Sequence, residues 1–278
     1  MSKTSQPIRP TLPAMRVMLI VAALLVFTVG IPLNLLPLQT DRFFAWTIAT
    51  PLTAAFLGAA YWSSGVLEFL ASREHVWVRA RIAVPAVFLF TILTLIVTLI
   101  HRDRFHFDSP DFITRSGTWV WLLVYTTVPI ILGVLWLLQA RAPRIDPPRA
   151  FPMPAWLRVA AFLQAVIMIP VGIALLIAPE AMATVWPWSL TPLTGRAIGA
   201  WIVSIGVAAA QAAWENDLER VRVATMSYIA IGVLELIALI RFAGDMNWAT
   251  AAAWVYIVFL VSFIAVGLGG WLAARKAK

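Results

Sequence analysis

The sequence contains no cysteine and only three histidines, and charged residues make up 12% of its 278 positions. The lack of cysteine excludes disulfides, thiolate metal sites and a cysteine nucleophile. No long apolar run contains a histidine or a lysine, which argues against a membrane haem held by two histidines and against a retinal Schiff base. The middle of these runs also lacks carboxylates, which argues against a proton-relay pump.

Apolar residues are abundant instead, at 62% of the chain, with a mean hydropathy of +0.88. In soluble domains roughly a quarter of the residues are charged, so lipid must surround most of this chain. A helix needs about 20 apolar residues to cross a hydrocarbon core of about 30 Å. The sequence therefore predicts an all-α integral membrane protein with eight transmembrane helices, at 15–36, 50–71, 82–100, 118–140, 156–178, 192–213, 221–241 and 248–273.

The basic residues predict the orientation of these helices. Most of the 21 lysines and arginines lie in the two termini and in alternate loops, including the linker 141–155. By the positive-inside rule, the termini and this linker are cytoplasmic, and we expect a multi-pass protein of the plasma (inner) membrane. The expected partners are the lipid bilayer and anionic headgroups on its cytoplasmic side. Because the charges are divided among short segments, nucleic acid is not an expected partner.

One element occurs twice in the chain. "TPLTAAFLGAAYWSSG" begins at Thr50 and "TPLTGRAIGAWIVSIG" at Thr191, and eight of the sixteen aligned positions are identical. The pattern Glu-x4-Arg-x-Arg also recurs, beginning at Glu74 and at Glu215. These matches predict two parallel four-helix repeats related by a pseudo-two-fold axis along the membrane normal. Residues 1–140 form the first repeat, 141–155 a proline-rich cytoplasmic linker and 156–278 the second repeat.

The repeated stretch also predicts local structure. Thr50 and Thr191 each precede a proline, a pattern typical of an N-cap followed by the first helical position. Both copies continue with glycines spaced along one helix face, and small residues allow close helix packing in lipid. We therefore expect the second and sixth membrane helices to lie in the interior of the bundle.

Five residues within the apolar runs are candidate ligand-binding residues. Arg196 and Glu235 lie at similar depths of about 7 and 9 Å below the outer surface. We therefore predict that they form an ion pair, which either joins two helices or lines an outward-facing cavity. Glu68 belongs near the cytoplasmic interface, in a polar vestibule or as a charge that fixes topology. Among the 14 tryptophans, Trp62 and Trp201 lie deep enough to line an aromatic pocket or to serve in packing.

Possible metal ligands gather in the outer loop "HRDRFHFDSPDFITRSG", where His101, Asp103 and His106 are the candidates. Imidazole and carboxylate groups bind Zn²⁺ and similar ions. The spacing matches no established metal motif, and a charged loop beside a bilayer is the alternative explanation. No cofactor is expected elsewhere in the chain.

Three functions remain open at this stage. The first is the binding or translocation of a small hydrophobic or lipid-like molecule between the two halves. The second is a membrane scaffold or sensor without transport, and the third is a membrane enzyme that uses the outer His/Asp loop. A continuous cavity between the halves would favour the first function, a solid interface the second, and converging loop side chains the third. The sequence leaves open whether the chain forms a homo-oligomer.

Overall fold

A computed structural model describes residues 8–276, and every regular element in that range is a helix. Eight of the helices are long and apolar enough to cross a membrane, which confirms the predicted number and indicates a multi-pass membrane protein. Their limits agree with the predicted runs to within a few residues, except that the fourth begins earlier. They are α1 (Pro13–Leu35), α3 (Pro51–Ser72), α5 (Ala83–Ile100), α6 (Phe112–Arg141), α7 (Ala155–Ile177), α9 (Pro192–Glu215), α10 (Leu218–Arg241) and α11 (Ala251–Lys276).

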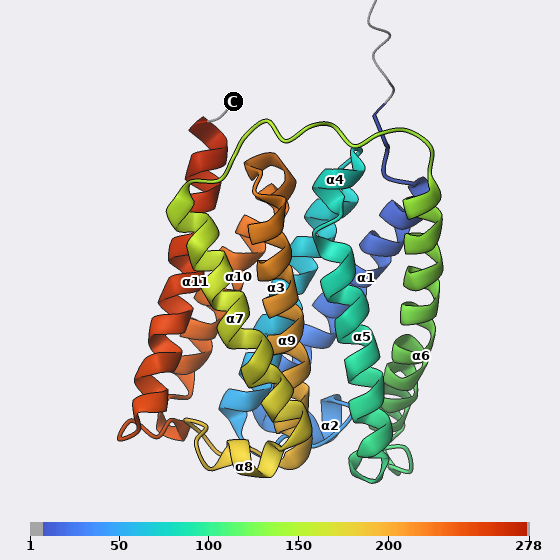
Figure 1. Ribbon diagram of the computed structural model, residues 1–278. Helices are drawn as coiled ribbons and strands as arrows, with labels where there is room; N and C mark the ends of the chain where they lie inside the picture. The colour runs from blue at the N-terminus through green and yellow to red at the C-terminus, as the bar shows by residue number, and fades with distance from the viewer. Residues whose placement is uncertain (1–7, 277–278) are drawn as a thin grey trace, which may run out of the picture.

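The short helices lie in the connections between these eight (Figure 1). They are α2 (Thr40–Phe43), α4 (Trp77–Ala80), α8 (Pro179–Ala183) and the 3-10 turns η1 (Pro37–Gln39), η2 (Arg102–Arg104) and η3 (Ala243–Asp245). The first described residues and the end of α11 lie at the same end of the bundle, which we call the terminal end. The connection from α6 to α7 crosses over this end, whereas α2 and α8 lie at the opposite end (Figure 1).

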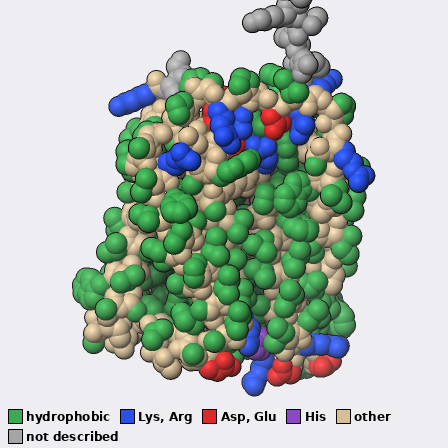
Figure 2. Space-filling model, viewed as in Figure 1, with side chains coloured by type: hydrophobic (Ala, Val, Ile, Leu, Met, Phe, Trp, Pro, Cys, Tyr) green, Lys and Arg blue, Asp and Glu red, His purple; other side chains and the backbone are tan. Residues whose placement is uncertain are grey.

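Four helices form the centre of the bundle. In α3, 72% of the apolar window is buried, compared with 22% in α11. Helices α3, α5, α9 and α10 are the most buried, and α1, α6, α7 and α11 surround them. The prediction that the second and sixth membrane helices are interior is therefore confirmed. Figure 2 shows hydrophobic side chains over the middle of one face and charged side chains gathered at its two ends.

Glycines explain why α3 and α9 approach their neighbours closely. A Cβ atom at Gly58 would lie 2.5 Å from the side-chain nitrogen of Asn34 on α1. One at Gly206 would lie 2.9 Å from Ile169 on α7. A larger side chain at either position would force the two backbones apart, and dispersion contacts between helices would be lost.

The inner helices of the two sequence halves interleave. Helix α3 packs on α1 and on α10, and α9 packs on α7 and on α5. By contrast, α3 makes little contact with α5, although the two are neighbours in the chain, and the same holds for α9 and α10. The two halves therefore meet through the contacts of α3 with α10 and of α5 with α9.

The starts of α3 and α9 differ although both follow the sequence TPLT. Thr191 caps α9 as predicted: its hydroxyl accepts from the N–H of Thr194, and the Thr194 hydroxyl accepts from the N–H of Thr191. Thr50 also occupies the predicted N-cap position with Pro51 after it, but its hydroxyl does not cap the helix and donates instead to a carbonyl in the connection before α9. The first turn of α3 is capped instead by Asp245, whose carboxylate accepts from the N–H of Leu52 at 2.9 Å.

Candidate functional site

A cavity of about 380 Å³ opens on the side of the bundle between α1 and α6. Helices α3 and α5 form its floor, and α2 closes it at the opposite end. Exposed apolar side chains stand at its mouth, including Ile31, Ile113 and Val120. The opening therefore faces the region that lipid occupies, and an apolar molecule can enter without crossing water.

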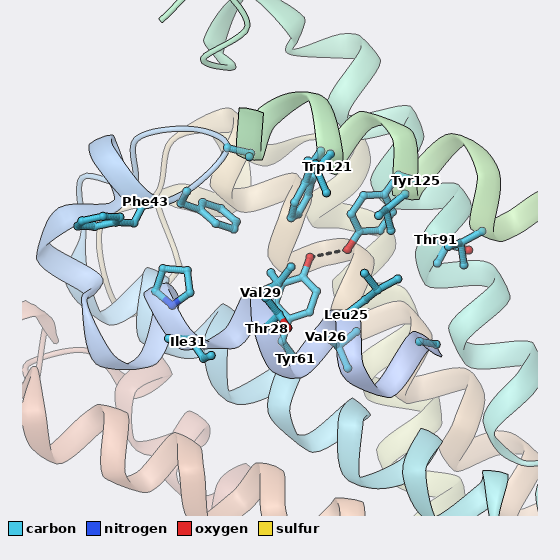
Figure 3. A pocket seen from close by; sticks show the side chains of 18 of the residues that line it. Leu25, Val26, Thr28, Val29, Ile31, Phe43, Tyr61, Thr91, Trp121 and Tyr125 are labelled. Atoms are coloured by element: carbon cyan, nitrogen blue, oxygen red, sulfur yellow. Dashed lines mark hydrogen bonds between the residues drawn. The ribbon is translucent and has the colours of Figure 1, made fainter. Parts of the chain in front are cut away.

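Two tyrosines meet inside this cavity (Figure 3). The hydroxyls of Tyr61 on α3 and Tyr125 on α6 are 2.7 Å apart and share a hydrogen bond. Trp121 packs on Tyr125 with ring centroids 4.5 Å apart, and its indole N–H donates to Thr98. Both tyrosines are buried, so these contacts fix the aromatic wall of the cavity.

Glu68 is the charged residue of the lining, and its side chain is 1% exposed. Ser64 lies one turn earlier on the same face of α3 and donates to Oε1 of Glu68 at 2.9 Å. The second oxygen, Oε2, has no hydrogen-bond partner among residues 8–276. The terminal torsion of a glutamate is soft, so this oxygen can turn toward a donor placed in the cavity.

The cavity is elongated along the membrane normal. On α1 its lining extends from Ala22 to Leu36, which corresponds to about 20 Å of helix axis. Glu68 lies four residues before the end of α3 at Ser72, or about 6 Å from the terminal end. The apolar length of the cavity therefore extends from the carboxyl group toward the opposite end of the bundle.

The predicted ion pair between Arg196 and Glu235 does not form within the described chain. Arg196 on α9 donates to the carbonyl of Leu176 at 3.0 Å and lies 2.8 Å from Nε2 of His101. Glu235 on α10 accepts from the hydroxyl of Tyr256 at 3.0 Å. Arg196 lies near the start of α9 and Glu235 near the end of α10, but α9 faces α5 and α7 whereas α10 faces α3 and α11, so the two side chains point to different neighbours.

The two candidate tryptophans have packing roles. Trp62 lies against Gly30 of α1, and its indole N–H donates to the carbonyl of Phe27 at 3.0 Å. Trp201 on α9 stacks on Phe90 of α5, with ring centroids 3.8 Å apart. Neither residue lines the cavity between α1 and α6, but Trp201 lines a small cavity between α3, α5, α9 and α10. Trp201 instead joins the inner helices of the two halves.

The proposed metal ligands do not come together. Asp103 pairs with the neighbouring Arg104, and the ring nitrogens of His106 lie near the hydroxyl of Thr47 and the carbonyl of Phe44. His101 contacts Arg196. Within residues 8–276, no three histidine, aspartate or glutamate side chains are arranged to hold a metal ion. His101 lies beside α9 and His106 beside the residues that follow α2, so the two imidazoles have different neighbours.

The interface between the two sequence halves contains a cavity of about 50 Å³, lined mainly by serines and apolar side chains from α3, α5, α9 and α10. This volume suits water but not a lipid-like molecule. The expectation of a ligand path between the halves therefore has no support in the packing. The larger cavities lie on the sides of the bundle.

The tyrosines were not among the candidate residues predicted from the sequence. The chain has four of them, and all lie inside membrane-crossing helices and line cavities. Tyrosine in membrane proteins is usually found near the two interfaces, so tyrosines within apolar runs were a usable signal. They are Tyr61 and Tyr125 in the cavity described above, Tyr228 in the cavity between the halves and Tyr256 in a second lateral cavity.

No protein-family model matches the chain, and no match is found among curated proteins or solved structures.

Proposed function

We propose that the protein binds a single-chain amphiphile taken from the membrane, with its apolar chain in the cavity between α1 and α6. The polar group of this molecule donates a hydrogen bond to Glu68. One observation carries the proposal: a buried carboxyl oxygen without a partner in the described chain borders an apolar cavity that opens toward lipid.

The size and chemistry of the cavity support this ligand. Its volume of about 380 Å³ falls within the range of roughly 300–1,000 Å³ that is typical of small-molecule sites. An unsatisfied buried polar group costs about 1–3 kcal/mol, so a ligand that supplies a donor to Glu68 recovers part of this free energy. An alcohol with one long alkyl chain has the required shape and donor.

The packing favours binding over translocation through the centre of the bundle. The two halves are joined by interleaved inner helices, and the cavity lies on one side of this core. A molecule in it stays in contact with the lipid phase. The proposed role is therefore reception of a membrane amphiphile rather than its passage between the halves.

We also propose that the chain consists of two equivalent units, residues 1–140 and 156–278, joined by the linker 141–155. Reciprocal contacts support this proposal. Arg222 of the second unit donates to Glu74 of the first at 2.7 Å, and Arg81 of the first pairs with Glu215 of the second. In both pairs the last arginine of one Glu-x4-Arg-x-Arg pattern meets the glutamate of the other, as a two-fold relation requires.

The terminal end is proposed to face the cytoplasm. The majority of the lysines and arginines of the chain lie there, in agreement with the positive-inside rule. In this orientation exposed cations such as Arg73 and Arg275 are placed to contact anionic headgroups. A reporter fused to the C-terminus and tested for protection in sealed vesicles checks this placement.

The binding test uses a radiolabelled long-chain alkanol with the purified protein in lipid nanodiscs. Gly117 borders the cavity, and a Cβ atom there meets open space, so Gly117→Trp adds an indole at the edge of the opening. We expect this variant to lose binding at the cavity, whereas Gly117→Ala binds normally. Glu68→Gln keeps the side-chain shape and should weaken binding about three- to tenfold, because one hydrogen bond is impaired.

Gly244 provides the matched position, since a Cβ atom there also meets open space and the residue lies outside the cavity lining. Gly244→Trp should therefore bind the alkanol as the parent protein does. Equal binding by the parent, Gly117→Trp and Glu68→Gln proteins would show that the cavity is not the binding site and would refute the proposal.

A further inference from the structure

We propose that the protein has a second amphiphile site on another side of the bundle, in a cavity between α7 and α11. Its ligand is a neutral single-chain molecule with a hydroxyl group, and that group lies in the opposite membrane leaflet from the one bound at Glu68. The two sites share no lining residue, so the second does not depend on the first.

The second cavity has a volume of about 240 Å³ and is lined almost entirely by apolar side chains. Exposed residues of its rim, including Ile167, Val185 and Val255, face the region that lipid occupies. Met168 and Met182 also line it, and methionine side chains adapt readily to apolar ligands. The cavity therefore accepts an alkyl chain from the membrane.

Two polar groups in this lining lack partners. Glu235 is 0% exposed, and its Oε2 accepts from Tyr256, whereas its Oε1 has no hydrogen-bond partner in the described chain. The indole N–H of Trp186 is also buried without a partner within residues 8–276. The cavity thus contains one unused acceptor and one unused donor.

This combination selects the chemistry of the ligand. A hydroxyl group both donates and accepts, so its chemistry matches the unused acceptor of Glu235 and the unused donor of Trp186. An ammonium group donates only, and it would leave the indole N–H unsatisfied. The site therefore distinguishes an alkanol from an alkylamine of the same length.

The depths of the two carboxyl groups place the ligands in different leaflets. Glu235 lies six residues before the end of α10 at Arg241, or about 9 Å from the opposite end. Glu68 lies about 6 Å from the terminal end. Because the hydrocarbon core is about 30 Å thick, each carboxyl belongs to its own leaflet. The two alkyl chains then point in opposite directions.

Tyr256 holds the carboxyl of Glu235 in place. Its ring packs edge-on against Trp188, with centroids 5.1 Å apart, while its hydroxyl donates to Oε2. This contact leaves Oε1 as the oxygen that is available to a ligand. The corresponding role in the first cavity is filled by Ser64, which donates to Oε1 of Glu68.

The experiment uses an alkanol that carries an aryl diazirine at the end remote from the hydroxyl, bound to the full chain in nanodiscs. Peptide mapping after photolysis reports where each chain end lies. We expect one cross-linked set near residues 31–45 of the first cavity. A second set should lie near 259–263 on α11 or 167–168 on α7, and the stoichiometry should approach two alkanols per chain.

Variants then separate the two sites. Glu235→Gln should weaken labelling at α7 and α11 about three- to tenfold and leave labelling near 31–45 unchanged, so the first site serves as a folding control in the same sample. Trp186→Phe should reduce the preference for the alkanol over an alkylamine probe of equal length. Trp254→Phe, an exposed position on α11 outside the cavity, is the matched control and should change neither measurement.

The outcomes distinguish this inference from the proposed function. Labelling confined to residues 31–45 overturns the second site and leaves the first standing. Labelling confined to α7 and α11 supports the second site and overturns the first. Labelling at α7 and α11 that is unchanged in Glu235→Gln overturns the role of the carboxyl, and so does a chain end found near the opposite end of α11.

Discussion

The two ends of the bundle join the same helices by different kinds of interaction. At the terminal end the halves are linked by ion pairs, whereas at the opposite end they are linked mainly by hydrogen bonds of single side chains to neutral groups. We therefore expect substitutions at the two ends to lower the free energy of unfolding by different amounts.

At the terminal end, Glu215 is the centre of the ion pairs. Its side chain is buried and pairs with Arg81 from the first half and with Arg220 from its own half. Arg81 also pairs with Asp146 of the linker at 3.0 Å, and Arg220 donates to the carbonyl of Pro147. The linker is therefore fastened to both halves.

At the opposite end, the contacts between halves involve single groups. Asp245 caps α3, the indole N–H of Trp188 donates to Thr53 at 2.8 Å, and Arg241 donates to the carbonyl of Asn34. Each of these bonds can be removed alone without leaving a second buried charge. We therefore expect substitutions at this end to lower the free energy of unfolding less than substitutions at the terminal end.

The largest expected effect comes from Glu215→Gln. Removing one partner of a buried ion pair costs about 3–5 kcal/mol; here Arg220 loses its carboxylate partner, whereas Arg81 is partly exposed and keeps Asp146. The free energy of unfolding measured in bicelles should fall by this amount. Glu219→Gln is the control, because its pair with Arg79 is partly exposed and should be worth at most about 1 kcal/mol. An equal fall in the free energy of unfolding for Glu215→Gln and Glu219→Gln would contradict the expected difference between the buried and the partly exposed ion pair.

An intermediate effect is expected for Asp245→Ala, which removes the cap of α3. Loss of an N-cap costs about 1 kcal/mol, within a range of roughly 0.5–2. Asp103 occupies the matching 3-10 turn of the other half but is exposed and pairs only with Arg104 in the described chain. Asp103→Ala should therefore change the free energy of unfolding by less than about 0.5 kcal/mol. A loss from Asp245→Ala as large as that from Glu215→Gln would remove the distinction between the ends.

The smallest effect is a pH dependence at His101. Burial lowers the pKa of His101, and the nearby positive charge of Arg196 lowers it further, with Asp103 acting in the other direction. Nε2 of His101 accepts from Arg196, so it must be unprotonated for this bond to exist. The folded-state pKa of His101 lies below the unfolded value of about 6.5. The contribution of its bond with Arg196 to stability is therefore complete above about pH 6.5 and is lost as the pH falls through the folded-state pKa.

Unfolding measurements between about pH 7.5 and pH 5 should therefore show a stability that declines on acidification. Part of this decline should disappear in His101→Gln, since the glutamine oxygen can accept from Arg196 and does not titrate. His106→Gln is the control in the same loop. If the His101→Gln protein shows the same pH profile as the parent, the Arg196 contact does not contribute to it.

The sequence alone determined the number and approximate limits of the membrane helices and the interior position of the second and sixth. An apolar run that is long enough to cross the bilayer predicts a membrane helix, and the glycines that follow TPLT predict close packing against neighbouring helices. The positions of Arg196, Glu235 and Glu68 along their helices also followed from the sequence. These properties depend on local sequence and on the helix rise, so they needed no tertiary information.

The tertiary structure alone decided which side chains meet. Arg196 and Glu235 share a depth but lie on helices that face different neighbours, and Asp245, far from Thr50 in the chain, caps the helix that Thr50 precedes. The cavities likewise arise where α1 and α6, or α7 and α11, fail to fill the space beside the core. Depth is a property of one helix, whereas a contact or a cavity depends on how several helices are rotated and packed together.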